Sequence, residues 1–96
     1  MYDYHDARLK SATLDWESGI TTIVFALCAE PAREVAITVQ ETTDLNFKRQ
    51  FPWGKSVSVD RLRIQRFNSG YRLELEMQSG DKIVVLGEEV SEKTPD

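Results

Sequence analysis

Hydrophobic and polar residues alternate with a period of two through most of this chain, and no window shows the stripe of an amphipathic helix. Segment 20–28 is apolar on both faces, which is typical of a central strand that is covered on each side. The alternation predicts strands at 7–16, 20–28, 35–40, 57–64, 71–77 and 82–86, with a short edge segment at 45–47. We therefore predict an all-β fold, an antiparallel sandwich or a strongly curved meander sheet of about six to eight strands.

Turn-forming residues separate these segments. Glu17-Ser18-Gly19, Asn68-Ser69-Gly70 and Ser79-Gly80-Asp81 are each typical of a turn. The chain has 96 residues, which is enough for one modest core. We expect a single β domain at 1–90 and a flexible tail at 91–96, where the sequence is charged and contains proline.

The hairpin expected between residues 57 and 77 has a register that follows from its hydrophobic pattern. Paired residues share a face of the sheet, so Leu62 and Ile64 should face the apolar residues of segment 73–77. This pairing requires a loop of two or four residues at the turn. The apolar positions also change parity within the first strand, which predicts a bulge near Asp60-Arg61.

Charge is unevenly distributed along the chain. The formal net charge is −4, so the molecule as a whole has no reason to bind nucleic acid or an anionic membrane. The middle of the chain is nevertheless basic, with Lys48, Arg49, Lys55, Arg61, Arg63, Arg66 and Arg72.

Two interpretations of this basic region remain open. In one, segment 47–66 binds phosphates and stacks bases on its aromatic residues. In the other, its arginines neutralise acidic residues on the neighbouring strand. The hairpin register favours the second, because it places Arg61 and Arg63 opposite Glu74, Glu76 or Gln78 in a cross-strand charge ladder.

Residues with catalytic or metal-binding chemistry are few. Cys28, the single cysteine, lies in an apolar segment and is expected to be a core residue. His5 and Asp6 could hold a weak metal ion or act as acid and base. Neighbours in an extended chain point to opposite sides, however, so we expect these residues to cap the start of the chain. Gly54-Lys55-Ser56 reproduces only the end of a phosphate-binding loop. We expect no enzymatic activity, no metal and no cofactor.

The location of the protein is predicted from three further features. A single cysteine gives no sign of an oxidising compartment. Segment 1–6 is acidic and polar, unlike a secretory signal. The longest apolar stretch, near 23–29, is about a third of the roughly 20 residues that a membrane helix needs. We expect a cytoplasmic protein with no membrane association.

The least generic segment is Phe51-Pro52-Trp53-Gly54, in which two aromatic residues flank a proline. In one interpretation Trp53 folds back and caps one end of the core. In the other, Phe51 and Trp53 stay partly exposed beside Lys48, Arg49 and Lys55, an arrangement typical of protein-contact hot spots.

Two motifs carry a resemblance to known proteins. Tyr4-His5-Asp6-Ala7-Arg8-Leu9, followed by Leu14-Asp15-Trp16-Glu17-Ser18-Gly19, resembles the opening of a group of small, mostly uncharacterised bacterial all-β proteins. Pro52-Trp53-Gly54-Lys55-Ser56-Val57-Ser58-Val59 resembles a loop-and-strand signature of the same group. A similar His-Asp-Ala-x-Leu head occurs in some immunity proteins of bacterial toxin systems. The resemblance implies a compact antiparallel β fold and a protein-binding role.

These features favour a non-enzymatic protein-interaction module, immunity-like in its function. Its expected partner-binding residues are Phe51, Trp53, Lys55, Lys48 and Arg49. The alternative is nucleic-acid or phospholigand binding through segment 47–66. An isolated sheet would leave an apolar face of segments 20–28 and 82–86 uncovered, so either the sheet folds over on itself or two copies pair as a homodimer.

Overall fold

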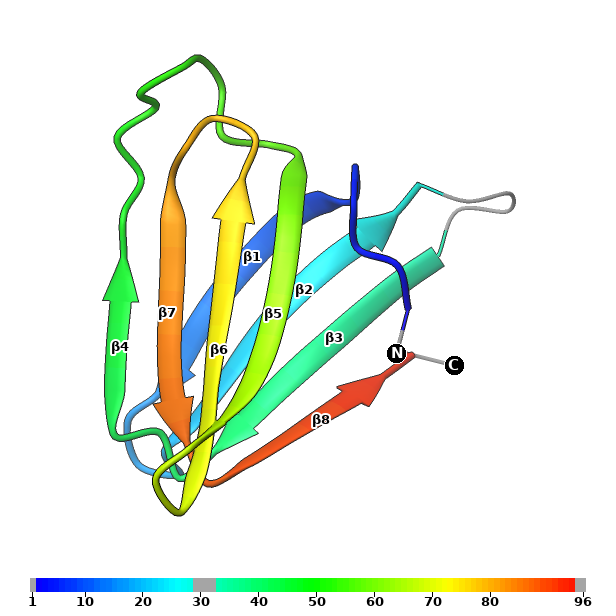
Figure 1. Ribbon diagram of the computed structural model, residues 1–96. Helices are drawn as coiled ribbons and strands as arrows, with labels where there is room; N and C mark the ends of the chain where they lie inside the picture. Colours follow the sequence, from blue (N-terminus) through cyan, green and yellow to red (C-terminus); the bar gives the residue numbers. More distant parts are fainter. Residues whose placement is uncertain (1, 29–32, 95–96) are drawn as a thin grey trace.

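Eight strands form two four-stranded antiparallel sheets in the computed structural model, which describes residues 2–28 and 33–94 (Figure 1). One sheet has the order β1-β2-β3-β8 and the other the order β4-β7-β6-β5. The strands are β1 (Arg8–Asp15), β2 (Ile20–Leu27), β3 (Arg33–Gln40), β4 (Asp44–Phe47), β5 (Val59–Phe67), β6 (Gly70–Met77), β7 (Lys82–Gly87) and β8 (Glu89–Lys93). The prediction of an all-β antiparallel fold is confirmed. Within the described ranges, no helix is long and apolar enough to cross a membrane.

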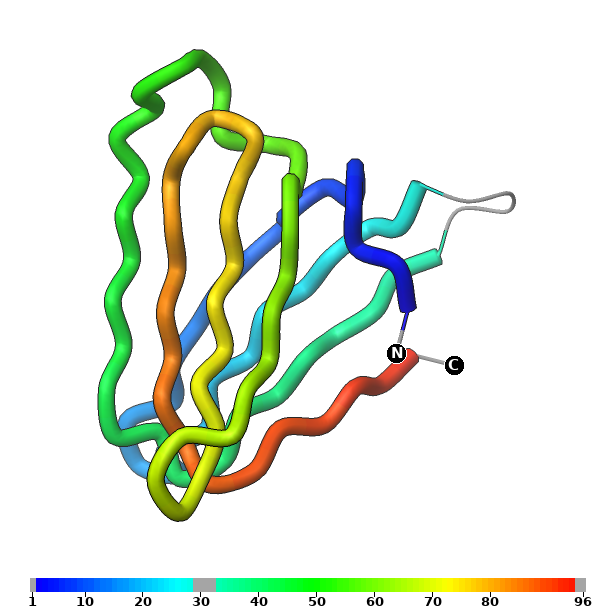
Figure 2. The backbone as a smooth tube through the Cα atoms, in the orientation of Figure 1, coloured from blue at the N-terminus to red at the C-terminus, as the bar shows by residue number. Residues whose placement is uncertain are grey.

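The hydrophobic core lies between the inner faces of the two sheets. Alternate residues of β2 and β3 are buried from one side, and alternate residues of β6 and β7 from the other. The largest fully buried side chains include Phe25, Ile23, Ile37, Leu73 and Leu75. The strands of one sheet run at a clear angle to those of the other (Figure 2). The core is therefore built from residues that strict period-two alternation selects.

β2 lies between β1 and β3, but only one of its faces is fully buried. Ile23 and Phe25 point into the core, whereas Val24 and Ala26 stay partly exposed. The expectation that this strand is covered on both sides is therefore wrong. Cys28 is also exposed, because β2 ends at Leu27, which corrects its expected place in the core.

The β5–β6 hairpin has the register predicted from its hydrophobic pattern. Leu62 pairs with Leu75, and the two residues Asn68-Ser69 connect the paired ends of the strands. The pairing shifts between Val59 and Arg61, where the change of parity predicts a bulge. The predicted register and the predicted bulge are both confirmed. The register follows because apolar residues of this hairpin gain contacts only when they share the inner face of the sheet.

β8 corrects the expected boundary of the domain. Ser91 to Lys93 were expected in a flexible tail, but they continue β8 and pair with β3. Two interactions explain this: Val90 packs against the core, and the Glu92 carboxylate accepts hydrogen bonds from the Tyr4 hydroxyl and the Tyr2 backbone N–H. Part of the expected tail, residues 95–96, lies outside the described residues.

The chain crosses between the sheets where β7 leads into β8, and two glycines come close together there. Gly70 pairs next to the Gly87 end of β7, and a Cβ on Gly70 would overlap the Gly87 carbonyl oxygen and lie 3.2 Å from the Glu88 Cα. Both obstructing atoms belong to the backbone, so neither can move without disturbing the crossing.

We expect Gly70→Ala to lower the free energy of unfolding by about 1–3 kcal/mol, the usual cost of overpacking a closed site. Urea denaturation followed by circular dichroism measures this change. Ser69→Ala, in the adjoining exposed turn, is the matched control and should change stability by less than about 0.5 kcal/mol. Equal effects of the two variants would show that the close approach of the glycines contributes nothing to the free energy of unfolding.

Candidate functional site

The connection from β4 to β5 contains all five residues expected to bind a partner. We call residues 48–55 the aromatic-basic loop; it includes Lys48, Arg49, Phe51, Trp53 and Lys55, each of them exposed. β4 and β5 form opposite edges of their sheet. The loop therefore has to pass across the end of the sheet, and in Figure 1 it arches over the β6–β7 turn at the top of the view.

A buried carboxylate holds this loop in place. Asp81, in the β6–β7 turn, is only 3% exposed. Its Oδ1 accepts hydrogen bonds from the backbone N–H groups of Gln50 (2.7 Å) and Phe51 (3.2 Å), and the Ser79 hydroxyl donates to Oδ2 (3.1 Å). Removal from water acts to raise the pKa of Asp81, but donors from Gln50, Ser56, Phe51 and Ser79 lower it overall. The sequence assigned Asp81 only to a turn.

Trp53 is exposed, yet its backbone is fixed. Its side chain is 79% exposed, so the interpretation in which Trp53 caps the core is wrong. Its backbone N–H donates to the Ser79 carbonyl oxygen at 3.0 Å. One part of the indole ring lies directly against Gly80, where a Cβ would overlap it. The indole thus rests on the β6–β7 turn and presents most of its surface to solvent.

Phe51 adopts a backbone conformation that few non-glycine residues adopt. Its φ is 56°, in the left-handed region. The backbone N–H groups of Phe51 and Gln50 both point at the Asp81 carboxylate. The Phe51 ring is 39% exposed, and the Arg49 guanidinium lies 4.5 Å from its centroid. Hydrogen bonds to Asp81 therefore stabilise a conformation that turns the aromatic ring toward a cation.

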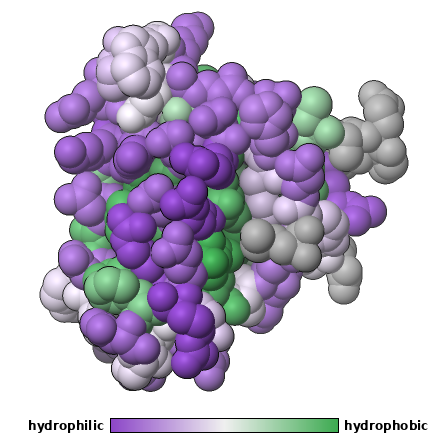
Figure 3. Space-filling model, viewed as in Figure 1, coloured by the Kyte–Doolittle hydropathy of each residue, from purple (hydrophilic) through white to green (hydrophobic). Residues whose placement is uncertain are grey.

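The structure divides the basic region into two surfaces. On the outer face of the β5–β6 hairpin, Arg61 lies 3.8 Å from Glu76, Arg72 lies 2.9 Å from Glu74, and Arg63 pairs in register with Glu74. This face is mostly hydrophilic in Figure 3. The predicted charge ladder is confirmed, since Arg61 and Arg63 stand opposite Glu76 and Glu74.

The loop cations differ from Arg61 and Arg72, which have glutamate partners. Among the described residues, Lys48, Arg49 and Lys55 form no ion pair within 4.0 Å. Their charge is therefore not paired with a carboxylate within residues 2–28 and 33–94. A local positive potential results on a molecule whose net charge is −4.

A cleft opens beside the loop, between the edge strands β1 and β4. Its volume is ≈ 390 Å³, and Arg8, Lys10, Lys48 and Arg49 line it together with apolar side chains. Sequence analysis identified Lys48 and Arg49 but missed Arg8 and Lys10, which are about forty positions away in the chain. No local pattern could connect them, because only the packing of the two sheets brings β1 and β4 together.

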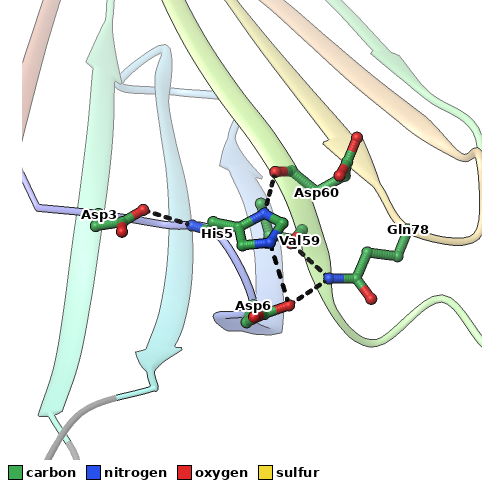
Figure 4. Close-up of polar contacts among 6 residues, drawn as sticks. All are labelled: Asp3, His5, Asp6, Val59, Asp60 and Gln78. Atoms are coloured by element: carbon green, nitrogen blue, oxygen red, sulfur yellow. Dashed lines mark hydrogen bonds and ion pairs between the residues drawn. The ribbon is translucent and has the colours of Figure 1, made fainter.

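The N-terminal segment forms a polar cluster with β5 (Figure 4). The His5 Nδ1 lies 2.9 Å from the Asp60 carbonyl oxygen, and Nε2 lies 3.6 Å from Asp6 Oδ1, to which Gln78 Nε2 donates at 2.6 Å. Asp6 has a φ of 67°, so the chain turns there, contrary to the extended conformation that we assumed. The hydrogen bond to Asp60 and the charge of Asp6 raise the pKa of His5.

These contacts attach the N-terminal segment to the start of β5. Within the described residues, no group of three or more histidine, cysteine, aspartate or glutamate side chains is placed to hold a metal ion. His5 Nδ1 is engaged by a backbone carbonyl and Nε2 faces a carboxylate, so the interactions are those expected of a capped chain start.

Sequence analysis also missed a second exposed tryptophan. Trp16 was expected to end the strand predicted at 7–16, but β1 ends at Asp15 and Trp16 is 88% exposed in the following turn. Asp15 and Glu17 flank it. Trp16 thus lacks the basic neighbours of Trp53 and serves as its natural control.

No protein-family model matches this chain, and no curated protein matches it significantly. The function therefore has to be inferred from the loop and the cleft themselves.

We expect Asp81→Asn to destabilise the protein at neutral pH, because an amide NH₂ cannot accept the hydrogen bonds that the second carboxylate oxygen accepts. The folded-state pKa of Asp81 is lowered, so its contribution to stability is present above the usual aspartate value of 3.8 and is lost as the pH falls through the lower folded-state pKa.

Urea denaturation of wild type and variant over a series of pH values measures this difference. The two unfolding free energies should converge in strongly acidic solution. Asp44→Asn, at an exposed position on the edge strand β4, is the control and should change stability little. A stability difference between wild type and Asp81→Asn that is the same at low and neutral pH would contradict the assigned role of the carboxylate.

Proposed function

We propose that this protein is a non-enzymatic interaction module that binds an acidic surface of a partner protein through the aromatic-basic loop. The observation that carries the proposal is the exposure of Trp53, 79%, on a backbone that Asp81 and Ser79 hold in place. Burial of an exposed indole ring in a complex is favourable, and tryptophan is among the residues most enriched in interface hot spots.

The fixed backbone favours tight binding. A loop that is ordered before binding loses less conformational entropy on association than a flexible one. Hydrogen bonds restrain the loop backbone at Gln50 and Phe51, which both donate to Asp81, and at Trp53, which donates to the Ser79 carbonyl oxygen. The aromatic side chains therefore remain in position to contact a partner.

The charges around Trp53 indicate which partner surface fits. Lys48, Arg49 and Lys55 are exposed and have no ion-pair partner among the described residues. Acidic groups on a partner would gain favourable contacts with them and would be steered toward the loop. The partner site should accordingly combine a hydrophobic depression for Trp53 with surrounding carboxylates.

The second candidate function is the binding of a phospholigand or of single-stranded nucleic acid. The observation that favours it is the gathering of Arg8, Lys10, Lys48 and Arg49 around one cleft next to exposed aromatic rings. Because Arg61 and Arg63 face Glu76 and Glu74, the basic surface available to a ligand is smaller than segment 47–66. We rank this function below protein binding.

The resemblance of the N-terminal head to immunity proteins suggests a bacterial toxin as one partner to test. We retain the cytoplasm as the proposed location, on the single-cysteine content. A homodimer stays a proposal supported by the half-exposed outer face of β2.

We expect Trp53→Ala to weaken partner binding by at least about 30-fold, the equivalent of about 2 kcal/mol for a hot-spot residue. Stability should change by less than about 0.5 kcal/mol, because most of the indole surface is already in water. Capture of the partner on immobilised wild-type and variant protein, followed by calorimetry with the purified partner, measures the first effect. Thermal unfolding measures the second.

Trp16→Ala is the matched control, since it removes an equally exposed tryptophan from a turn with acidic neighbours. It should leave partner capture unchanged. Equal losses of partner binding in both variants would show that the loop is not the specific binding site. Intact binding with a large loss of stability in Trp53→Ala would make the loop a structural element.

The two candidate functions respond differently to oligonucleotides. If the loop binds protein, a fluorescent single-stranded oligonucleotide should show no saturable change in anisotropy at low salt. Binding that falls steeply with added salt and is lost in Lys48→Gln/Arg49→Gln would instead favour the nucleic-acid function.

A further inference from the structure

The cleft between β1 and β4, which we call the β1–β4 cleft, is an unsealed part of the interior. Leu9 and Ala12 pair with the buried residues Phe25 and Ile23, so they lie on the inner face of their sheet. Phe47 pairs with Ile83 and lies on the inner face of the other sheet. These inner faces line the ≈ 390 Å³ cleft instead of packing against each other.

Local sequence explains why the sheets stay apart here. Ala12 is too small to reach the opposite sheet, β4 has only 4 residues, and β1 has a register shift between Leu9 and Ser11. Phe47 is consequently 45% exposed even though it lies on an inner face. The cleft therefore has an apolar floor that is open to solvent, and covering it would be favourable.

The rim of the cleft is cationic. Arg8, Lys48 and Arg49 line it and form no ion pair among the described residues, while Lys10 lies 2.9 Å from Glu34. No acidic side chain is among the residues that line the cleft. A neutral apolar ligand would leave these charges without partners, and a small inorganic anion would leave the apolar floor uncovered.

We propose that the β1–β4 cleft binds an amphipathic anion, a carboxylate or phosphate joined to an aliphatic chain. The anionic group contacts Arg8, Lys48 and Arg49, and the chain packs against Leu9, Ala12, Phe47 and Ile83. The volume lies within the range of small-molecule sites, roughly 300–1,000 Å³. This site does not depend on the proposed protein-binding function, although Lys48 and Arg49 adjoin both surfaces.

Titration of ¹⁵N-labelled protein with octanoate tests the proposal. Octanoate should shift the amide resonances of residues 9–12 and 47–49 in a saturable way. Acetate, which has the charge without the chain, and 1-octanol, which has the chain without the charge, should each bind at least tenfold more weakly. Octyl phosphate should compete with octanoate for the same amides.

Two variants separate the parts of the site. Ala12→Phe fills the cleft and should abolish the octanoate shifts, with the remaining spectrum showing that the fold is kept. Lys48→Gln/Arg49→Gln should weaken octanoate at least tenfold. Arg61→Gln, on the outer face of the β5–β6 hairpin, should leave it unchanged.

The outcomes also distinguish this site from the protein-binding loop. Trp53→Ala should leave octanoate binding unchanged, and Ala12→Phe should leave partner capture unchanged. Shifts that do not saturate in the millimolar range, equal binding of acetate and octanoate, or shifts that survive in a folded Ala12→Phe variant would each overturn the proposal.

Discussion

The structure depends on one constraint: two angled sheets must cover each other with a small number of alternating apolar residues. Where large residues such as Phe25 and Ile37 meet the inner face of the opposite sheet, the core is fully closed. Where the inner face carries Ala12 against the short strand β4, it stays open. The stability of the fold and the existence of a cleft thus have the same origin, because a domain of this size lacks the side-chain volume to seal every edge.

The second organising interaction is the buried carboxylate of Asp81. A charged group at this depth is tolerated because backbone and hydroxyl donors surround it, and those donors come mainly from the aromatic-basic loop. The loop consequently takes its conformation from the β6–β7 turn. The exposure of Trp53 is a consequence of this anchoring. The turn accepts hydrogen bonds from the loop backbone, and the indole stays outside the core.

The basic residues fall into two groups, one that stabilises the sheet and one that is available to bind a ligand or partner. Arg61 and Arg72 form ion pairs with Glu76 and Glu74, and Arg66 contacts the Tyr71 ring, so these hairpin arginines stabilise the sheet. Lys48, Arg49 and Lys55 of the loop and Arg8 of the cleft have no such partners among the described residues, although Lys55 and Arg61 are near each other in the sequence. Two binding surfaces follow from this division: an exposed aromatic surface that suits a protein, and an apolar cleft with a cationic rim that suits an amphipathic anion.

The sequence by itself determined the strands β1 to β7, the β5–β6 register, the bulge near Asp60-Arg61 and the charge ladder, because each follows from period-two alternation or from residues close in the chain. It did not determine the exposure of Trp16 and Cys28, since a hydrophobic residue next to a strand end fits either side of the boundary. It left the exposure of Trp53 open, because Trp53 lies in the long connection between β4 and β5, where no alternation assigns a face. It also missed β8, whose place depends on contacts with Tyr4 and β3. The role of Asp81 and the β1–β4 cleft were decided only by tertiary structure. Both join segments that lie about thirty or more positions apart in the chain, and a local sequence pattern carries no information about contacts at that separation.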